Sequence, residues 1–177
     1  MQQSKVAVGI LTTLLATGSL AADEPADGVR LTLDWLARPV RSAVQGAARR
    51  LAEPACLALL DEFRDARGTP LRRRLDSLHL DAASYLRLVL FYDGSNEAPC
   101  RRRRLLLAYT APGFRFVRIC PPLAALGRSD PRETQFVVIH ELLHTLGLAE
   151  NPPSHDEITA RVRSRCQGPG LALPATW

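Results

Sequence analysis

The segment from Asp130 to Gly147, DPRETQFVVIHELLHTLG, restricts the fold of this chain more than any other part of the sequence. Asp130 is a typical helix N-cap, Pro131 suits the first helical position, and Glu133 would complete a capping box. Gly147 is a typical stop at a helix C-terminus. Most side chains in the second half are apolar on every side, so we predict a buried helix.

Three polar residues interrupt the apolar half of this helix: His140, Glu141 and His144. Histidines at this spacing project from one face of a helix about one turn apart, a separation that tetrahedral zinc accepts. Buried imidazoles and carboxylates are costly unless they find a metal or hydrogen-bond partners. We therefore predict that His140 and His144 bind Zn²⁺ and that Glu141 is the general base, as in an H-E-x-x-H motif. A structural histidine pair is the alternative.

Three residues beyond the helix compete for the place of a third ligand. Glu150 follows the helix stop directly, and Pro152-Pro153 would hold the chain after it extended. Glu157 is a second carboxylate, although with Ser154 it forms an S-x-x-E capping box for a C-terminal helix. His155 is a good nitrogen donor. We predict Glu150 as the third ligand, followed in order by Glu157 and His155, which leaves one metal position open for water.

The segment HELLHTLGLAE resembles the active-site helix of the zincin metallopeptidases. It is similar to the metzincin form, in which the helix ends at a glycine and a third ligand follows three residues later. Metzincins usually have histidine where this chain has Glu150, and the only methionine is Met1, so no Met-turn can form. The run that continues to ENPPS and EIT also resembles exported bacterial proteins of unassigned function. The zincin resemblance implies a peptide substrate that lies extended along the edge strand of a sheet.

Strand patterns lie in the middle of the chain, and helical patterns lie before them. Residues 84–94 are rich in strand formers, and residues 100–120 contain two strand-like runs around the turn APG, which predicts a hairpin. Residues 29–68 have helical spacing with expected breaks near Pro39 and Pro54. We therefore predict a small α+β, zincin-like fold. Its parts are N-terminal helices, a small sheet with a hairpin, the buried helix and a C-terminal helix, in one domain over residues 29–177.

The N-terminus has the pattern of a secretory signal peptide. Lys5 precedes an apolar run, and small residues lead to a cleavage site after Ala21, which predicts a signal peptide over residues 1–21. The run of roughly 15 apolar residues is shorter than the about 20 needed to cross a bilayer. Residues 22–28 are expected to be a disordered leader. We expect an exported protein, periplasmic or secreted, with no membrane span after processing.

The four cysteines lie in the predicted mature part, where an oxidising compartment would allow them to pair. No C-x-x-C pair is present, which favours two disulfides over thiolate zinc ligands. Cys100 and Cys120 stand at the two ends of the predicted hairpin and would lie near each other across its strands. We predict that they form one bridge and that Cys56 pairs with Cys166.

The charge of the mature chain comes from arginine. With Lys5 removed, 22 arginines face 18 acidic residues, a formal net charge of +4. The runs Arg101–Arg104 and Leu71–Leu75 have no interleaved aromatic residues and match no nucleic-acid motif, so we expect no nucleic-acid partner. Exposed, solvated arginines or a contact with anionic surfaces are the expected roles.

These patterns predict an exported zinc peptidase that cleaves a peptide or protein substrate. Tyr109, on a predicted strand, is a candidate helper for the oxyanion, with simple packing as the alternative. His79 is expected to be a surface or helix residue. A catalytically inactive, zincin-like binding module of the cell envelope is the alternative function. A basic surface-binding protein with an accidental H-E-x-x-H is a further possibility.

Overall fold

The computed structural model describes residues 28–168. The predicted signal peptide, residues 1–21, lies outside this range, and so does the predicted leader except for its last residue, Gly28. Gly28 is buried, and its carbonyl accepts a hydrogen bond from the N–H of Phe91 at 2.8 Å. Within the described range, no helix combines the length and the hydropathy that crossing a membrane requires.

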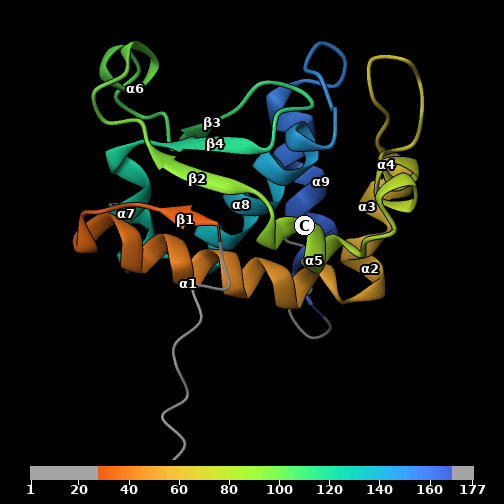
Figure 1. The fold of residues 1–177 in the computed structure, drawn as a ribbon, viewed down its shortest axis with the longest axis horizontal. Coiled ribbons are helices and arrows are strands. Elements are labelled where there is room, and N and C mark those ends of the chain that lie inside the picture. Colours follow the sequence, from red (N-terminus) through yellow and green to blue (C-terminus); the bar gives the residue numbers. More distant parts are fainter. Residues whose placement is uncertain (1–27, 169–177) are drawn as a thin grey trace, which may run out of the picture.

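A mixed four-stranded sheet forms one layer of the molecule, in the order β1-β2-β4-β3 (Figure 1). Strands β1 (Val29–Arg30), β2 (Leu90–Asp93) and β4 (Phe116–Ile119) are parallel to one another. Strand β3 (Ala108–Tyr109) is antiparallel to β4 and forms an edge of the sheet. The predicted α+β class is confirmed.

Helix α1 (Asp34–Leu51) runs along the sheet and packs against α5, α7 and α8 (Figure 1). Its buried residues, which include Leu36, Val40 and Val44, recur at helical spacing and give the helix one continuous face toward the core, whereas Trp35 is exposed. The other helices are α2 (Pro54–Leu57), α3 (Leu59–Glu62), α4 (Leu71–Leu78), α5 (Ala82–Arg87), α6 (Ala98–Arg102), α7 (Pro121–Ser129), α8 (Pro131–Thr145) and α9 (His155–Cys166).

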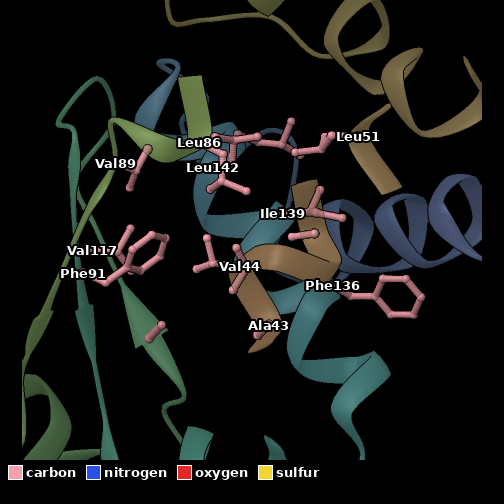
Figure 2. Close-up of a cluster of buried hydrophobic side chains, with 14 of the residues drawn as sticks. Ala43, Val44, Leu51, Leu86, Val89, Phe91, Val117, Phe136, Ile139 and Leu142 are labelled. Carbon is pink, nitrogen blue, oxygen red and sulfur yellow. The ribbon is translucent and has the colours of Figure 1, made fainter. Parts of the chain in front are cut away.

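The hydrophobic core lies between the sheet and the pair α1 and α8. Phe91 of β2 and Val117 of β4 extend from the sheet toward Val44 of α1 and Leu142 of α8 (Figure 2), and none of the four is more than 2% exposed. The two helices approach closely at Gly46, where an added Cβ would lie 2.3 Å from the side chain of Gln135. Helix α8 is therefore the buried central helix that its sequence predicts.

The structure corrects three local expectations. Helix α1 continues through Pro39 without a break. The carbonyl that Pro39 leaves without its usual helical partner belongs to Trp35, a residue that is 48% exposed. The predicted strand from Ser84 begins as helix α5, because Asp81 caps it by accepting the Ser84 N–H at 2.7 Å. The first half of the predicted hairpin contains the short helix α6, so only β3 and β4 pair.

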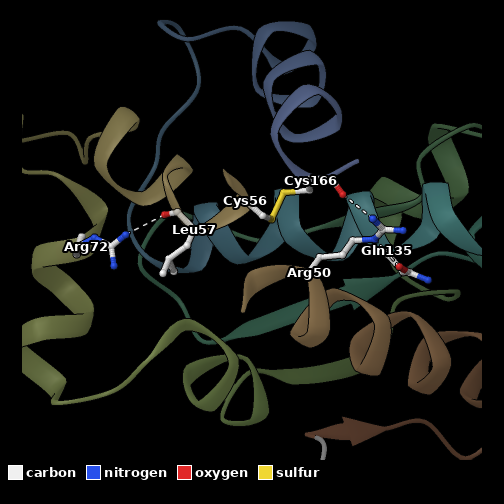
Figure 3. The surroundings of a disulfide bond; sticks show 6 residues. All are labelled: Arg50, Cys56, Leu57, Arg72, Gln135 and Cys166. Carbon is white, nitrogen blue, oxygen red and sulfur yellow. Dashed lines mark hydrogen bonds between the residues drawn. A yellow bond between two sulfur atoms is a disulfide. The ribbon is translucent and has the colours of Figure 1, made fainter. Parts of the chain in front are cut away.

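Both predicted disulfides are present. Cys100–Cys120 joins α6 to the end of β4, and Cys56–Cys166 joins α2 to the last residue of α9. Beside the second bridge, Arg50 of α1 donates hydrogen bonds to the side chain of Gln135 and to the Cys166 carbonyl (Figure 3). These bonds fix α9 against α1 and α8.

Candidate metal centre

Helix α8 begins as predicted, but one detail of its cap differs. The Asp130 side chain accepts the N–H of Glu133 at 2.9 Å, which confirms Asp130 as the N-cap. The Glu133 carboxylate does not complete a capping box. It instead accepts hydrogen bonds from Arg163 of α9, with 2.9 Å between Arg163 Nε and Glu133 Oε1. Glu133, which we predicted to cap α8 locally, therefore links α8 to α9.

The C-terminal end of α8 orients His144. Gly147 has a φ of 114°, a conformation that favours glycine, and the chain reverses there. The N–H of Gly147 donates to the His144 carbonyl and that of Leu148 to Leu143, which forms a Schellman turn. The turn places the Leu148 carbonyl 2.8 Å from Nδ1 of His144. A carbonyl can only accept, so Nδ1 carries the hydrogen and Nε2 of a neutral imidazole keeps a free lone pair.

His140 is oriented by a different element. The hydroxyl of Thr159, on α9, lies 3.0 Å from Nδ1 of His140 and can accept its hydrogen. The Nε2 atoms of His140 and His144 then face each other at 3.0 Å. Burial, followed by repulsion from His144 and His155, lowers the pKa of His140 to about 3, so this imidazole is neutral at pH 7.

Glu150 completes a group of three possible ligands. Its Oε1 atom lies 3.4 Å from Nε2 of His144 and 3.9 Å from Nε2 of His140, and the three donor atoms all lie within 4.8 Å of one another. Donor atoms around a tetrahedral zinc are about 3.3 Å apart, given ligand distances of about 2.0–2.1 Å. The group is therefore close to the dimensions that zinc requires.

The chain after Glu150 forms a tight turn and is not extended as predicted. The N–H of Asn151 donates to the Pro153 carbonyl at 2.9 Å, and Asn151 has a φ of 71°. This turn brings His155 back toward Glu150. The Nδ1 atom of His155 lies 3.4 Å from Oε1 of Glu150.

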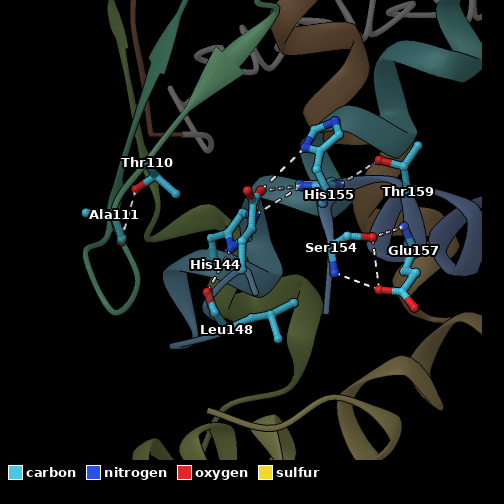
Figure 4. Close-up of polar contacts among 10 residues, drawn as sticks. Thr110, Ala111, His144, Leu148, Ser154, His155, Glu157 and Thr159 are labelled. Carbon is cyan, nitrogen blue, oxygen red and sulfur yellow. Dashed lines mark hydrogen bonds and ion pairs between the residues drawn. The ribbon is translucent and has the colours of Figure 1, made fainter. Parts of the chain in front are cut away.

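The structure separates the competitors for the third position. Glu157 accepts the Ser154 N–H at 2.7 Å, and the reciprocal bond is also present, so the predicted capping box is confirmed (Figure 4). His155 is beside the group, with its ring centroid 4.6 Å from that of His140. Among the described residues, however, only Glu150 joins the two histidines in a cluster of mutually close donors.

Glu141 is buried beside these ligands and has an unused acceptor. Its Oε2 atom has no hydrogen-bond partner among residues 28–168. Burial, and then the charge of Glu150, raises the pKa of Glu141 to about 8. A nearby cation would favour the carboxylate form instead. An orphaned buried oxygen beside two free imidazole nitrogens fits a site that holds a metal ion and a water molecule.

A cleft runs between the histidines and the edge strand β3. Its two cavities, of about 170 and 520 Å³, both reach His140, Glu141 and His155. Leu106 and Ala108, on the β3 side, also line both cavities. The group of ligands is therefore accessible from solvent next to an edge strand.

Tyr109 and His79 do not extend the group. Tyr109 lines the cleft, but its hydroxyl donates a hydrogen bond to Glu97, whose carboxylate also pairs with Arg118 at 3.0 Å. Burial and the Glu97 carboxylate raise the pKa of Tyr109 to about 12. His79 is exposed at the end of α4, which agrees with the expected surface or helix position.

Comparison of the chain with protein-family models, with curated proteins and with solved structures finds no match. The function is therefore inferred from the residues of the site. The sequence predicted His140, His144 and Glu150 as ligands, and the structure brings these three together. The contacts of Thr159 and of the Leu148 carbonyl were not predicted. The signal for Leu148 was available, since a glycine stop predicts the turn that returns this carbonyl to the helix.

Proposed function

We propose that this chain is an exported, zinc-dependent peptidase. His140, His144 and Glu150 would hold the zinc, and Glu141 would act as the general base. The observation that carries the proposal is the convergence of three donor atoms within 4.8 Å beside a buried carboxylate oxygen that has no hydrogen-bond partner in the described part of the chain.

The donor set supports zinc as the metal. Two neutral imidazoles and one carboxylate are a common ligand set of catalytic zinc sites, which keep a fourth position for water. Each histidine also has a hydrogen-bond partner on Nδ1, Thr159 for His140 and the Leu148 carbonyl for His144. Such partners select the tautomer whose Nε2 binds metal.

The chemistry assigned to the chain's own residues is proton transfer and substrate alignment. Zinc, when bound, would lower the pKa of water to about 7 and polarise a peptide carbonyl. The Glu141 carboxylate would accept a proton from the attacking water and deliver it to the leaving amine. The free Oε2 atom of Glu141 supports this role, because a base needs an acceptor that no protein group already occupies.

The place of β3 supports a peptide as the substrate. A strand at the edge of a sheet has backbone groups free to pair with an extended peptide. Ala108, Tyr109 and Thr110 belong to or follow this strand and line the cleft over the histidines. An edge strand beside an H-E-x-x-H helix also agrees with the proposed zincin resemblance. The two disulfides support an oxidising compartment, and so export.

The test measures zinc content and hydrolysis in the same preparations. The wild-type protein should contain about one zinc per chain and cleave an unfolded protein, and a chelator should abolish cleavage. His140→Ala should lose the zinc, whereas the matched control His79→Ala should retain it. Glu141→Gln should keep zinc but lose at least about 100-fold in rate.

The outcomes separate the alternatives. Zinc binding by wild-type protein that cleaves no substrate would favour the inactive binding module. Wild-type protein that binds no zinc, even when refolded with it, would contradict the proposal. Cleavage by Glu141→Gln at the wild-type rate would show that another group is the base.

A further inference from the structure

Four consecutive arginines, Arg101–Arg104, form an exposed basic run that the proposed chemistry does not use. All four side chains are exposed, and none pairs with an acidic side chain of the described part of the chain. Other arginines do form such pairs, including Arg72 with Asp61 and Arg163 with Glu133. The run therefore carries four positive charges at one place on the surface, without an ion-pair partner among residues 28–168.

The basic run is held beside the cleft. It begins directly after Cys100, which is bridged to Cys120 at the end of β4. Two backbone hydrogen bonds of Arg103 fix the C-terminal part of the run. The Arg103 N–H donates to the Pro99 carbonyl at 3.0 Å, and the Arg103 carbonyl accepts from the Leu106 N–H at 2.9 Å. The disulfide and these bonds give the run a defined position.

Arg103 connects the basic run to the proposed active site. It lines the same cavity as His140, His144 and Glu150. The chain then continues to Leu106, which lines both cavities of the cleft. A peptide long enough to lie along β3 would therefore reach the arginines within a few residues of the metal ligands.

We infer that the basic run binds an acidic segment of the substrate while the neighbouring residues of that substrate lie in the cleft. The inference rests on the proposed peptidase function and specifies its substrate class: peptides or proteins with Asp or Glu close to the cleaved bond. Guanidinium groups suit this partner because each can donate two parallel hydrogen bonds to one carboxylate.

Two other anionic partners fit the observations less well. A membrane-surface helix needs a broad apolar face, but α6 has only five residues. Near it in the sequence, the large apolar side chain that is strongly exposed is Leu105, at 89%. Single-stranded nucleic acid is usually held by aromatic side chains between basic ones, and residues 101–105 contain none. The cavity shared by Arg103 and the histidines favours a substrate segment.

The experiment compares two peptides that contain the same cleaved sequence. In one peptide this sequence is flanked by an Asp-Glu segment, and in the other by the matching Asn-Gln segment. At low salt, the wild-type zinc enzyme should cleave the acidic peptide with a kcat/KM about tenfold higher than that for the Asn-Gln peptide, mainly because its KM is lower. The preference should fade at about 1 M salt, where charges are screened beyond roughly 3 Å.

Two charge-matched variants locate the effect. The double variant Arg102→Ser, Arg103→Ser should keep its zinc but lose the preference for the acidic peptide. The control Arg73→Ser, Arg74→Ser removes the same charge from exposed positions on α4, at a different cavity, and should keep the preference.

Each further outcome decides between the two hypotheses. Equal cleavage of both peptides by the wild-type enzyme would overturn the inference and leave the peptidase function intact. If neither peptide is cleaved, the peptidase function fails, and fluorescence anisotropy of the labelled acidic peptide then tests the basic run directly. If that peptide does not bind, or binds equally well to the Arg102→Ser, Arg103→Ser variant, the inference is overturned. Tighter arginine-dependent binding to anionic phospholipid vesicles or to an RNA oligomer would also overturn it.

Discussion

The hydroxyl oxygen of Thr159 lies 3.0 Å from Nδ1 of His140, so a side chain of α9 orients a proposed ligand on α8. The Leu148 carbonyl, in the turn after α8, does the same for His144, at 2.8 Å. Both contacts direct Nε2 toward Glu150. The geometry of the site thus depends on residues that follow the motif, one in the turn after α8 and one in α9.

Thr159→Val should weaken zinc binding about 10-fold to 100-fold, because valine keeps the shape of threonine but cannot accept the Nδ1 hydrogen of His140. Competition with a chromophoric chelator measures the affinity. The control is Thr134→Val, which removes a buried threonine hydroxyl from α8 at a position bonded to the Asp130 carbonyl. If both variants bind zinc equally well, Thr159 does not orient the ligand.

The buried helix and the proposed ligands on it could be predicted because their signals are local. Asp130 and Gly147 specify the two ends of α8, and the spacing of His140 and His144 places both on one face. Thr159 could not be predicted in the same way. Its contact with His140 depends on how α9 packs against α8, which is a tertiary relationship that no short pattern contains.

The local errors arose where another interaction or a tolerated residue allowed a different structure. Residues 84–87 contain good strand formers, yet the Asp81 cap begins a helix there. Residues 98–102 form α6, with Pro99 in its first turn, where a proline is well tolerated. The predicted capping-box bond of Glu133 is absent, because its carboxylate accepts hydrogen bonds from Arg163. At α5 a cap, and at Glu133 a tertiary partner, outweighed a weak local preference.

Tyr109→Phe should leave the rate of peptide hydrolysis within about twofold of wild type, because the Tyr109 hydroxyl donates to Glu97 and not to the reacting groups. The same variant should remove a tyrosine with a pKa of about 12 from the alkaline absorbance titration. A loss of about 100-fold or more in kcat, with zinc content unchanged, would instead assign the hydroxyl to the oxyanion.

The bridge Cys56–Cys166 should contribute more to stability than Cys100–Cys120. The bridges span 110 and 20 residues, and the chain-entropy model gives the longer loop an advantage of about 1.5 kcal/mol. Urea unfolding of the two double Cys→Ala variants, both metal-free, measures the free energies. A larger loss of stability in the variant without Cys100 and Cys120 would contradict the prediction and would indicate that this bridge supports the sheet by other means.

The third ligand can be tested by two matched Glu→Gln substitutions. Glu150→Gln should weaken zinc binding at least about 10-fold, because Glu150 supplies the only carboxylate within reach of both histidines in the described part of the chain. Its thermal midpoint in the metal-free form should change little, since Glu150 is 41% exposed in a turn. Zinc affinity and thermal midpoint, measured on each variant, give two independent readouts.

Glu157→Gln should show the opposite pattern. Glu157 accepts hydrogen bonds from the backbone and the hydroxyl of Ser154, so its loss should cost about 1 kcal/mol or less in stability and leave the zinc in place. His155→Asn is the third arm, because His155 lies 3.4 Å from Glu150 without belonging to the cluster of mutually close donors. It should retain zinc at full occupancy. Release of zinc by Glu157→Gln together with retention by Glu150→Gln would move the third ligand to α9. Release by His155→Asn alone would assign the position to the imidazole.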